Sequence, residues 1–174
     1  MKILIVIAPE KFRDEELAGP VAAFQKAGIE FDIASIRRGP CTGMLGAKTT
    51  ATLAFEDIDP KRYDGLVIVG GVGSQAHLWD DDLLMPIVKM FHQSRKVVAA
   101  ICLATVVLAR AGILKGKKAT YFESPASFRE MKIGGAEITN APVVKDGRII
   151  TANGPSASHA FADAIVQALT AVEW

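Results

Sequence analysis

The sequence has almost no net charge and no long apolar run. Its 174 residues carry 20 Lys and Arg against 19 Asp and Glu, a formal net charge of +1. No basic block is interleaved with aromatic residues, and since phosphate binding needs concentrated positive charge, we expect no nucleic acid as a partner. The longest apolar runs, such as residues 97–102, fall far short of the roughly 20 residues that span a membrane. We therefore expect no membrane partner either.

Cysteine and histidine are also scarce. Cys41 lies in a Gly-Pro-Cys-Thr-Gly stretch that we expect to be a loop, and Cys102 ends a hydrophobic run. We expect no structural disulfide between them, which is typical of a protein from a reducing cytoplasm. The three histidines share no ligand spacing with each other or with a cysteine, so we predict no metal site. Cys41 is most simply a loop thiol without a role, with a resolving thiol as the alternative, and His77 is most simply a solvated loop residue.

The one candidate cofactor motif lies in the wrong context. Residues 71–76 follow an apolar run and formally match the glycine fingerprint of dinucleotide-binding folds. They lie far from the first strand-helix unit, and no acidic residue stands about 20 positions further on to bind a ribose. We therefore predict a protein that works without a cofactor.

Short apolar runs alternate with helical patterns along the whole chain. Such alternation is typical of a parallel sheet covered on both faces by helices. The predicted strands are 2–8, 31–35, 65–69, 97–101 and 118–121; the predicted helices are 17–27, 80–93, 104–111, 127–132 and a last one that follows Gly154-Pro155-Ser156 and ends near Leu169. The Thr-rich residues 48–52 are expected to be irregular. No linker or internal repeat interrupts the pattern, so we predict one α/β domain over residues 1–174.

Three local signals refine this prediction. Pro20 cannot donate a hydrogen bond to the carbonyl of Glu16, so the first helix either kinks there or begins near Gly19. The acidic run at 80–82 is typical of a helix N-cap whose carboxylates favour the helix dipole. The Asp-Gly pair at 146–147, between two apolar runs, predicts a hairpin near the C-terminus with a type I′ turn.

Cys102 is the most prominent candidate for chemistry because it follows the most apolar predicted strand and precedes a helix. In open α/β sheets, ligands bind beyond the carboxyl ends of the strands. The free amides and the dipole at the start of the following helix favour thiolate over thiol, so we expect a lowered pKa for Cys102. Ala100 and Ala104, two places before and after it, fit a nucleophile elbow, a tight turn that exposes the central side chain. The alternative from position alone is a small buried hydrophobe.

Several stretches, in order along nearly the whole chain, resemble one family. They are Ile3–Ala8 with Phe12–Leu17, Tyr63–Gly71, Val98–Cys102, Ala111–Thr120, and Val144–Gly147 with Gly154-Pro155. Together they are similar to the ThiJ/PfpI superfamily, which holds PfpI-type intracellular peptidases, glyoxalase III-like enzymes and the parkinsonism-associated deglycase. The resemblance implies a flavodoxin-like three-layer sandwich of the class I glutamine-amidotransferase type, with a mostly parallel sheet. It also implies a homo-oligomer, either a dimer or a larger assembly.

By this resemblance Cys102 is the nucleophile and Glu16 is the carboxyl group that hydrogen-bonds it. A carboxyl beside a thiolate is pushed toward its protonated form, so Glu16 can act as a general acid; a surface carboxylate at a helix start is the alternative. Gly70 and Gly71 would bring bare backbone close to the sulfur, and the amides of Gly71 and Leu103 would form an oxyanion hole. A simple tight turn after a strand would also explain the two glycines.

Two departures from the family bear on mechanism. PfpI-type peptidases carry a histidine directly after the cysteine and a glutamate from a neighbouring subunit, where this chain has Leu103 and Gln75. Glyoxalase and deglycase members place a histidine near the cysteine where this chain has Phe122. Peptidase activity is therefore disfavoured, and Glu16 remains the acid-base group for an enzyme reaction.

The sequence thus favours a cofactor-independent enzyme of the glyoxalase or deglycase kind that acts on a small reactive carbonyl. A redox-sensing or stress-protective protein with an oxidisable Cys102 is the alternative from another class. A PfpI-like cysteine peptidase is the third interpretation.

Overall fold

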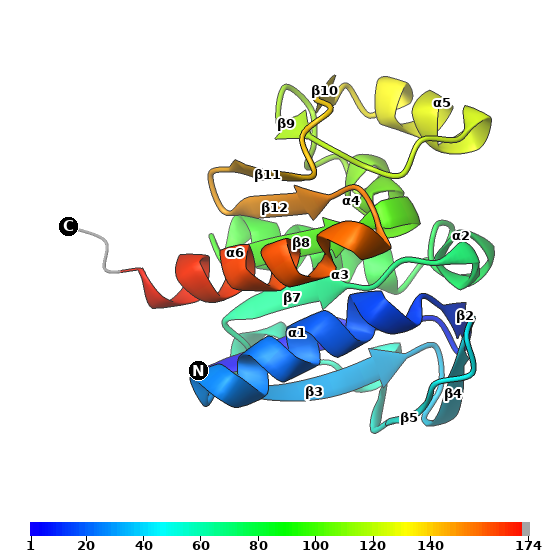
Figure 1. The fold of residues 1–174 in the computed structure, drawn as a ribbon, viewed down its shortest axis with the longest axis vertical. Helices are drawn as coiled ribbons and strands as arrows, with labels where there is room; N and C mark the ends of the chain where they lie inside the picture. Colours follow the sequence, from blue (N-terminus) through cyan, green and yellow to red (C-terminus); the bar gives the residue numbers. More distant parts are fainter. Residues whose placement is uncertain (172–174) are drawn as a thin grey trace.

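A seven-stranded sheet forms the centre of the computed structural model, which describes residues 1–171 (Figure 1). Its strands lie in the order β11-β12-β8-β7-β1-β3-β6, and every neighbouring pair is parallel except β11 with β12. The strands are β1 Lys2–Val6, β3 Glu30–Ser35, β6 Leu53–Ala54, β7 Gly65–Ile68, β8 Val97–Ile101, β11 Val143–Asp146 and β12 Ile149–Ala152. From β3 through β1, β7 and β8 to β12, the sheet follows the flavodoxin order 2-1-3-4-5. The predicted fold class is confirmed.

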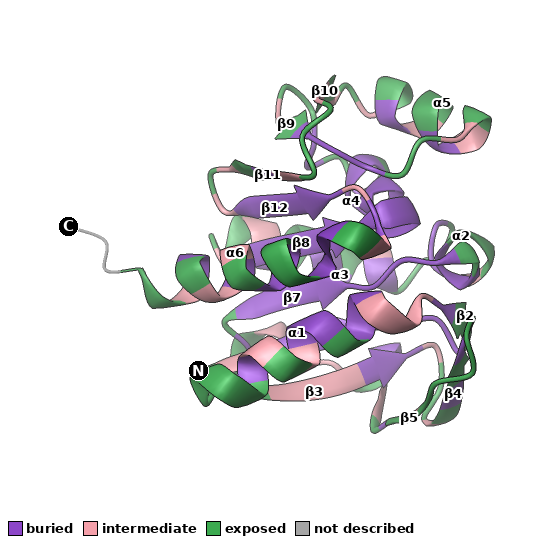
Figure 2. Cartoon of the chain, viewed as in Figure 1, coloured by how far each residue is buried: buried purple, intermediate pink, exposed green. Residues whose placement is uncertain are grey.

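Helices cover both faces of this sheet. α1 (Asp14–Ala27) and α6 (Ser158–Thr170) pack together on one face, and α3 (Leu84–Gln93) and α4 (Thr105–Arg110) lie against the other (Figure 1). Figure 2 shows that β7, β8 and β12 are buried, whereas α1 and α6 are buried on one side only. Strands that are buried on both faces have continuous apolar sequences, which is why the sequence identified them.

Two smaller sheets flank the central one. β2 (Glu10–Phe12), β4 (Gly39–Gly43) and β5 (Lys48–Ala51) form the first, and β9 (Lys118–Ala119) with β10 (Glu137–Ile138) forms the second.

Two sequence predictions in the first of these sheets are wrong. Cys41, expected in a loop, lies in β4 with 1 % of its surface exposed, and most of the stretch expected to be irregular forms β5. β4 and β5 are strands because they pair with each other. Their Gly, Pro and Thr residues hide the apolar alternation by which a strand is identified in a sequence.

α1 does not begin near Gly19 but at Asp14, and it continues through Pro20. Acidic residues fill its first turn, where they interact favourably with the helix dipole and compensate in part for the hydrogen bond that Pro20 cannot donate. Gly19 allows a close approach to α6, since a Cβ there would lie 3.1 Å from the carbonyl oxygen of Ser158. The pairing of α1 with α6, rather than local propensity, thus accounts for a helix of this length.

Two helices stand between β7 and β8 where one was predicted. α2 (Val72–His77) was missed, and α3 begins at Leu84 rather than at residue 80. The capping role of the acidic run is nevertheless present, because the Asp81 carboxylate accepts hydrogen bonds from the amides of Leu83 and Leu84 at 3.0 and 2.8 Å.

The hairpin of β11 and β12 is present, but its turn differs from the prediction. Asp146 pairs with Ile149, which leaves Gly147 and Arg148 in the turn, and of these only Gly147 has a positive φ, +63°. A positive φ at the first central residue alone is typical of a type II′ turn rather than type I′.

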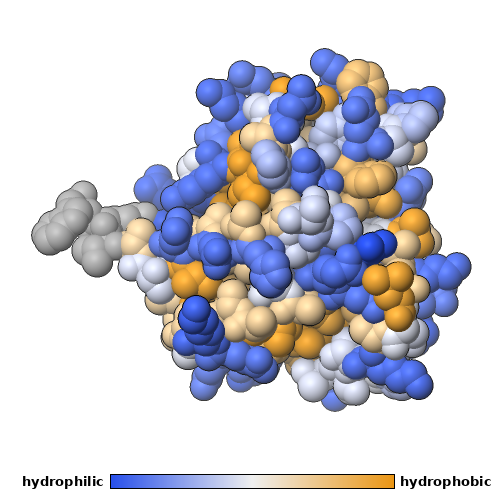
Figure 3. All heavy atoms as spheres, viewed as in Figure 1, coloured by the Kyte–Doolittle hydropathy of each residue, from blue (hydrophilic) through white to orange (hydrophobic). Residues whose placement is uncertain are grey.

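The two remaining predicted helices agree with the structure. α5 (Pro125–Ile133) lies near β9 and β10, and α6 follows Gly154-Pro155 as expected. Polar residues line the outer surface of α1 and α6, with apolar areas between them (Figure 3). Within residues 1–171, every helix is too short or too polar to cross a membrane.

Candidate active site

Cys102 occupies a strained turn at the carboxyl end of β8. β8 ends at Ile101, residues 102–104 form a single 3₁₀ turn, and α4 follows directly. Cys102 has a φ of +63°, a left-handed conformation that costs a residue with a side chain about 1–2 kcal/mol. The backbone therefore forms the predicted elbow. The residue is only 6 % exposed, so the turn directs the sulfur into a nearly closed site.

Glu16 reaches the same place from the first turn of α1. Gly70, two residues after the end of β7, lies between the two side chains: a Cβ on Gly70 would be 2.6 Å from Glu16 Oε1 and 2.8 Å from Cys102 Cβ. The structure thus brings together Glu16, Gly70 and Cys102. Because Glu16 is fully buried, it is not the surface carboxylate of the alternative interpretation.

Burial raises the pKa of Glu16 to about 7. The Cys102 thiol, the Gly70 backbone and the Arg13 guanidinium oppose this rise without cancelling it. Neither carboxyl oxygen has a partner at ordinary hydrogen-bond geometry within residues 1–171, so the thiol and the Gly70 backbone are weakly bonded neighbours. The carboxyl is therefore about half protonated near neutral pH, where it can accept or donate a proton.

The pKa of Cys102 moves in the direction opposite to our expectation. Burial raises it to about 12, and the negative charge of Glu16 adds to the rise. The amides of Leu103 and Gly71 oppose this shift, as expected for a sulfur at the start of a helix, but α4 is short and desolvation outweighs them. The prediction of a lowered pKa is wrong because it counted the helix and not the burial. Between about pH 7 and pH 12 the pair holds one proton and carries one negative charge.

The two amides that we expected to form an oxyanion hole both act on the sulfur of Cys102. Gly71 has a φ of +101°, and a Cβ there would lie 2.5 Å from the amide nitrogen of Arg13 and 2.7 Å from the carbonyl oxygen of Lys11. Only glycine allows the backbone to pass through this space, so the Gly71 amide can face the sulfur.

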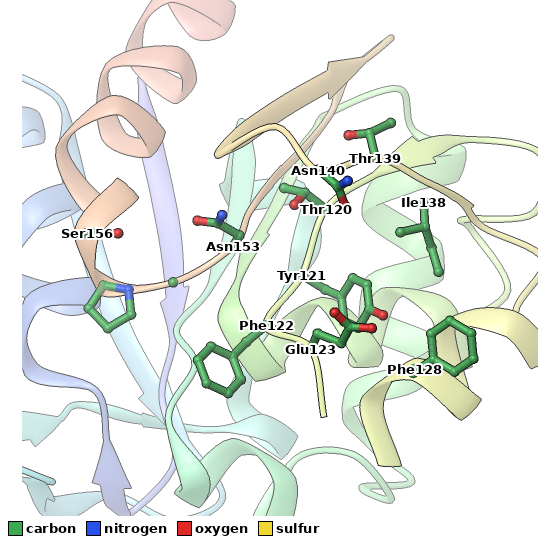
Figure 4. Close-up of a pocket in the computed structure, with 12 residues that line it drawn as sticks. Thr120, Tyr121, Phe122, Glu123, Phe128, Ile138, Thr139, Asn140, Asn153 and Ser156 are labelled. Atoms are coloured by element: carbon green, nitrogen blue, oxygen red, sulfur yellow. The ribbon is translucent and has the colours of Figure 1, made fainter. Parts of the chain in front are cut away.

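A cavity of about 420 Å³ includes Phe122, which contacts the elbow, in its lining (Figure 4). Its wall is joined to the elbow because the Phe122 amide donates a hydrogen bond to the carbonyl oxygen of Cys102 at 3.3 Å. Tyr121 and Glu123 point toward the side of the cavity that holds Phe128, whereas the ring of Phe122 turns the other way, toward Gly154 (Figure 4). The lining comes from residues 120–123, Phe128, and residues 138–140 and 153–156. No spacing rule joins these segments, so the sequence could not reveal the cavity.

Comparison with known proteins decides the family. The sequence model of the DJ-1/PfpI family matches residues 1–168. The chain belongs to the DJ-1/PfpI family. An uncharacterised protein of Methanocaldococcus jannaschii is 47 % identical over 97 % of this chain and 82 % of its own length. A deglycase of Thermococcus kodakarensis is 35 % identical over 97 % of this chain and 99 % of its own length.

Two further comparisons place this DJ-1/PfpI chain among its relatives. A putative cysteine protease of Bacillus subtilis is 32 % identical over 92 % of this chain and 94 % of its own length. The crystal structure of a ThiJ/PfpI domain protein from Brachyspira murdochii superposes with a TM-score of 0.94 at 35 % identity, over 99 % of this chain and 98 % of that one. The resemblance stated from the sequence is confirmed.

Other residues weighed in the sequence of this DJ-1/PfpI protein have separate environments. Gln75 is exposed on α2, and the ring of His77 pairs with the Glu10 carboxylate at 3.2 Å. Cys41 lies in β4, and both cysteines are free thiols. Within the described part of the chain, no cluster of three His, Cys, Asp or Glu side chains could hold a metal ion.

Two buried side chains at this DJ-1/PfpI site were not found from the sequence. Ser74 Oγ donates a hydrogen bond to the carbonyl oxygen of Gly71 at 2.7 Å, and Trp79 Nε1 donates one to the carbonyl oxygen of Leu103 at 2.8 Å. The sequence drew attention to residues 71–76 only as a glycine fingerprint. Nothing in the pattern links residue 79 to residue 103.

Proposed function

We propose that this DJ-1/PfpI protein is a cofactor-independent enzyme that acts on small reactive carbonyl compounds such as 2-oxoaldehydes, with Cys102 as nucleophile and Glu16 as proton carrier. The observation that carries the proposal is the pair itself: a thiol in a strained turn beside a fully buried carboxyl with a pKa of about 7. A titratable carboxyl at the reacting atom is what general acid-base catalysis near neutral pH requires. The similarity to a protein named a deglycase supports the same class of substrate.

The first step follows from the two pKa values. Because the pKa of Cys102 is high, the thiol rather than the thiolate is the form present near neutral pH. The Glu16 carboxylate accepts the thiol proton while the sulfur bonds to the carbonyl carbon. The amides of Gly71 and Leu103 stabilise the oxyanion that forms, and Glu16 then returns the proton to it. The product is a hemithioacetal, with no net gain or loss of protons.

For methylglyoxal the remaining chemistry needs no oxidant. Glu16 takes the proton from C1 of the hemithioacetal and a proton is delivered to C2, so one carbon is oxidised while its neighbour is reduced. The result is a thioester of lactate on Cys102. Water then breaks the carbon-sulfur bond and returns a proton to the sulfur, so that methylglyoxal and water give lactic acid. This balance is consistent with an enzyme that needs no cofactor.

The test is lactate formation from methylglyoxal by the purified full chain. We expect Cys102→Ser to abolish turnover and Glu16→Gln to lower it by about 10²-fold or more. Cys41→Ser changes the other thiol, which lies in β4, and should retain turnover. Equal turnover by the wild type and Cys102→Ser would contradict the proposal. Fluorescent casein tests the peptidase alternative, for which we expect no cleavage because Leu103 stands where those enzymes carry their histidine.

A redox-sensing or protective role is a second candidate, favoured by the weak bonding of the buried Glu16 carboxyl. Protonated Glu16 can donate a hydrogen bond to an oxidised sulfur, and neither of its oxygens has another partner at ordinary geometry within residues 1–171. Peroxide is the oxidant: one thiol and two molecules of hydrogen peroxide give a sulfinic acid and two of water. Intact mass after mild peroxide treatment tests this role. Two added oxygens that disappear in Cys102→Ser support it, and oxidation spread over methionines argues against it.

A further inference from the structure

One short segment of the chain hydrogen-bonds the carbonyl oxygens of Gly71 and Leu103, the two residues whose amides face the Cys102 sulfur. This segment, Val72–Trp79, consists of α2 and the two residues after it. Near its start, Ser74 is fully buried and binds the carbonyl oxygen of Gly71 twice, through its hydroxyl at 2.7 Å and its backbone amide at 3.0 Å. The peptide that follows the Gly71 amide is therefore fixed in orientation.

At its other end, the segment reaches the elbow. The indole Nε1–H of Trp79 donates a hydrogen bond to the carbonyl oxygen of Leu103 at 2.8 Å, and this bond is buried. The backbone amide of Trp79 donates in turn to the carbonyl oxygen of Ser74 at 3.1 Å. The indole thus fixes the peptide that follows the Leu103 amide, one residue after the strained Cys102.

Arg110, in the last turn of α4, holds the indole in place. Its guanidinium lies 5.6 Å from the ring centroid of Trp79 and donates to the Trp79 carbonyl oxygen at 3.3 Å. Both carboxylate oxygens of Glu130 on α5 accept from the same guanidinium, at 2.9 and 2.8 Å. A bidentate ion pair of this kind limits rotation of the arginine, and a cation over an indole face is attracted to it.

We propose that Ser74 and Trp79 are positioning residues that keep the amides of Gly71 and Leu103 directed at the Cys102 sulfur. A left-handed cysteine is unfavourable by itself and persists only where its neighbours determine it. The Trp79 indole holds the turn from one side and the Phe122 amide, bonded to the Cys102 carbonyl, holds it from the other. Without the indole the Leu103 carbonyl loses a buried partner, and the turn relaxes away from the sulfur. The inference rests on the proposed reactivity of Cys102, but it concerns the rate at which the thiol is modified and not the turnover of a substrate.

The test is the rate at which iodoacetamide modifies Cys102 in the full chain, measured by peptide mass across a pH series. Ser74→Ala removes the hydroxyl donor, and Trp79→Phe keeps an aromatic ring beside Arg110 but lacks the N–H. We expect each variant to react about threefold or more slowly near neutral pH, and its profile to move to higher pH, because the sulfur anion loses a donor. Since no substrate is involved, this result does not depend on whether methylglyoxal is turned over.

Whether the variants are modified more slowly or more quickly distinguishes a positioning role of Ser74 and Trp79 from a general loss of stability. Loosening of the fold would expose the buried thiol and speed its modification, which is the opposite of our expectation. Phe91→Leu is the matched control, since it removes a fully buried ring from α3, away from the elbow, and should not slow the reaction. Should Trp79→Phe fail to fold, Arg110→Met leaves the indole present but unsupported, and we expect slower modification there too. Folded variants that react as fast as the wild type, or faster, would overturn the proposal.

Discussion

At the scale of single residues, the Cys102 sulfur experiences two opposing effects. The amides of Gly71 and Leu103 favour its anion, while burial and the charge of Glu16 favour the thiol and raise its pKa. Near neutral pH the sulfur therefore keeps its proton, and the group that titrates there is the carboxyl of Glu16. In the proposed mechanism, Glu16 therefore acts as a proton acceptor for the thiol, and no thiolate is formed in advance.

The raised pKa of Glu16 makes stability depend on pH. The folded value of about 7 exceeds the ordinary 4.5, so the folded chain binds this proton more tightly than the unfolded chain does. The stabilisation is fully present below pH 4.5 and is lost as the pH rises through 7. We expect the wild type to lose ~3 kcal/mol of unfolding free energy over this range relative to Glu16→Gln. Urea unfolding at both ends of the range measures this, and a difference between the two proteins that is constant with pH would contradict it.

The meeting of Glu16 with Cys102 could be anticipated from the family resemblance, and the tight turn, though not its left-handed conformation, from the alanines around Cys102. The direction in which the pKa of the Cys102 thiol shifts could not be anticipated from the sequence. It depends on how completely α1 and the residues after β7 enclose the sulfur, and apolar periodicity does not measure enclosure. Ser74 and Trp79 were missed for a related reason. Each donates a hydrogen bond to a backbone carbonyl oxygen, and every residue type has one, so no sequence pattern indicates the bond.

At the scale of helices and strands, whether an element could be predicted from the sequence depended on where its stabilising contacts come from. Buried parallel strands such as β7 and β8 could be predicted because their sequences are apolar throughout. α1 and β5 could not be delimited, because the first depends on packing against α6 and the second on pairing with β4. Local signals place an element reliably only when the element's own residues supply its stability.

The start of α3 provides a test at this scale. Asp81→Ala removes the acceptor for the amides of Leu83 and Leu84, and we expect it to lower the unfolding free energy by about 1 kcal/mol. Asp82→Ala changes an exposed carboxylate in the same acidic run and should alter stability by less than about 0.5 kcal/mol. Urea denaturation distinguishes the two variants. Equal losses in both would show that the run acts through its charge rather than through a cap.

At the scale of the whole molecule, the candidate site lies at the carboxyl ends of the parallel strands. Gly70 follows β7 and Cys102 follows β8, while α1 carries Glu16 to the same end of the sheet. This location could be predicted from the open-sheet rule, since all parallel strands present their carboxyl ends together. The cavity could not be predicted from the sequence, because loops form most of its wall and no periodic pattern determines the conformation of a loop.

Self-association is a further expectation at this scale. The family resemblance implies a dimer or a larger assembly, and large apolar side chains stand exposed, with Leu45 at 66 % and Ile133 at 74 %. Exposed apolar side chains of this size often belong to contact surfaces when they gather into a patch. Sedimentation velocity on the full chain, whose protomer mass is 18.6 kDa, measures the outcome. A single species at the protomer mass over a range of concentrations would contradict the expectation.

The strand order also has a consequence for biosynthesis. β1 is translated before the other strands of the sheet yet lies in its interior, between β3 and β7, and β8 and β12 then add outward in the order of their translation. α6 is translated after all of these strands and carries Phe161 and Ile165, both fully buried, onto the face that holds α1. A nascent chain that stops before residue 158 would therefore expose apolar surface on α1 and on the sheet beside it. Termination of translation shortly before residue 158 should thus yield an aggregation-prone polypeptide rather than a stable, slightly shortened fold.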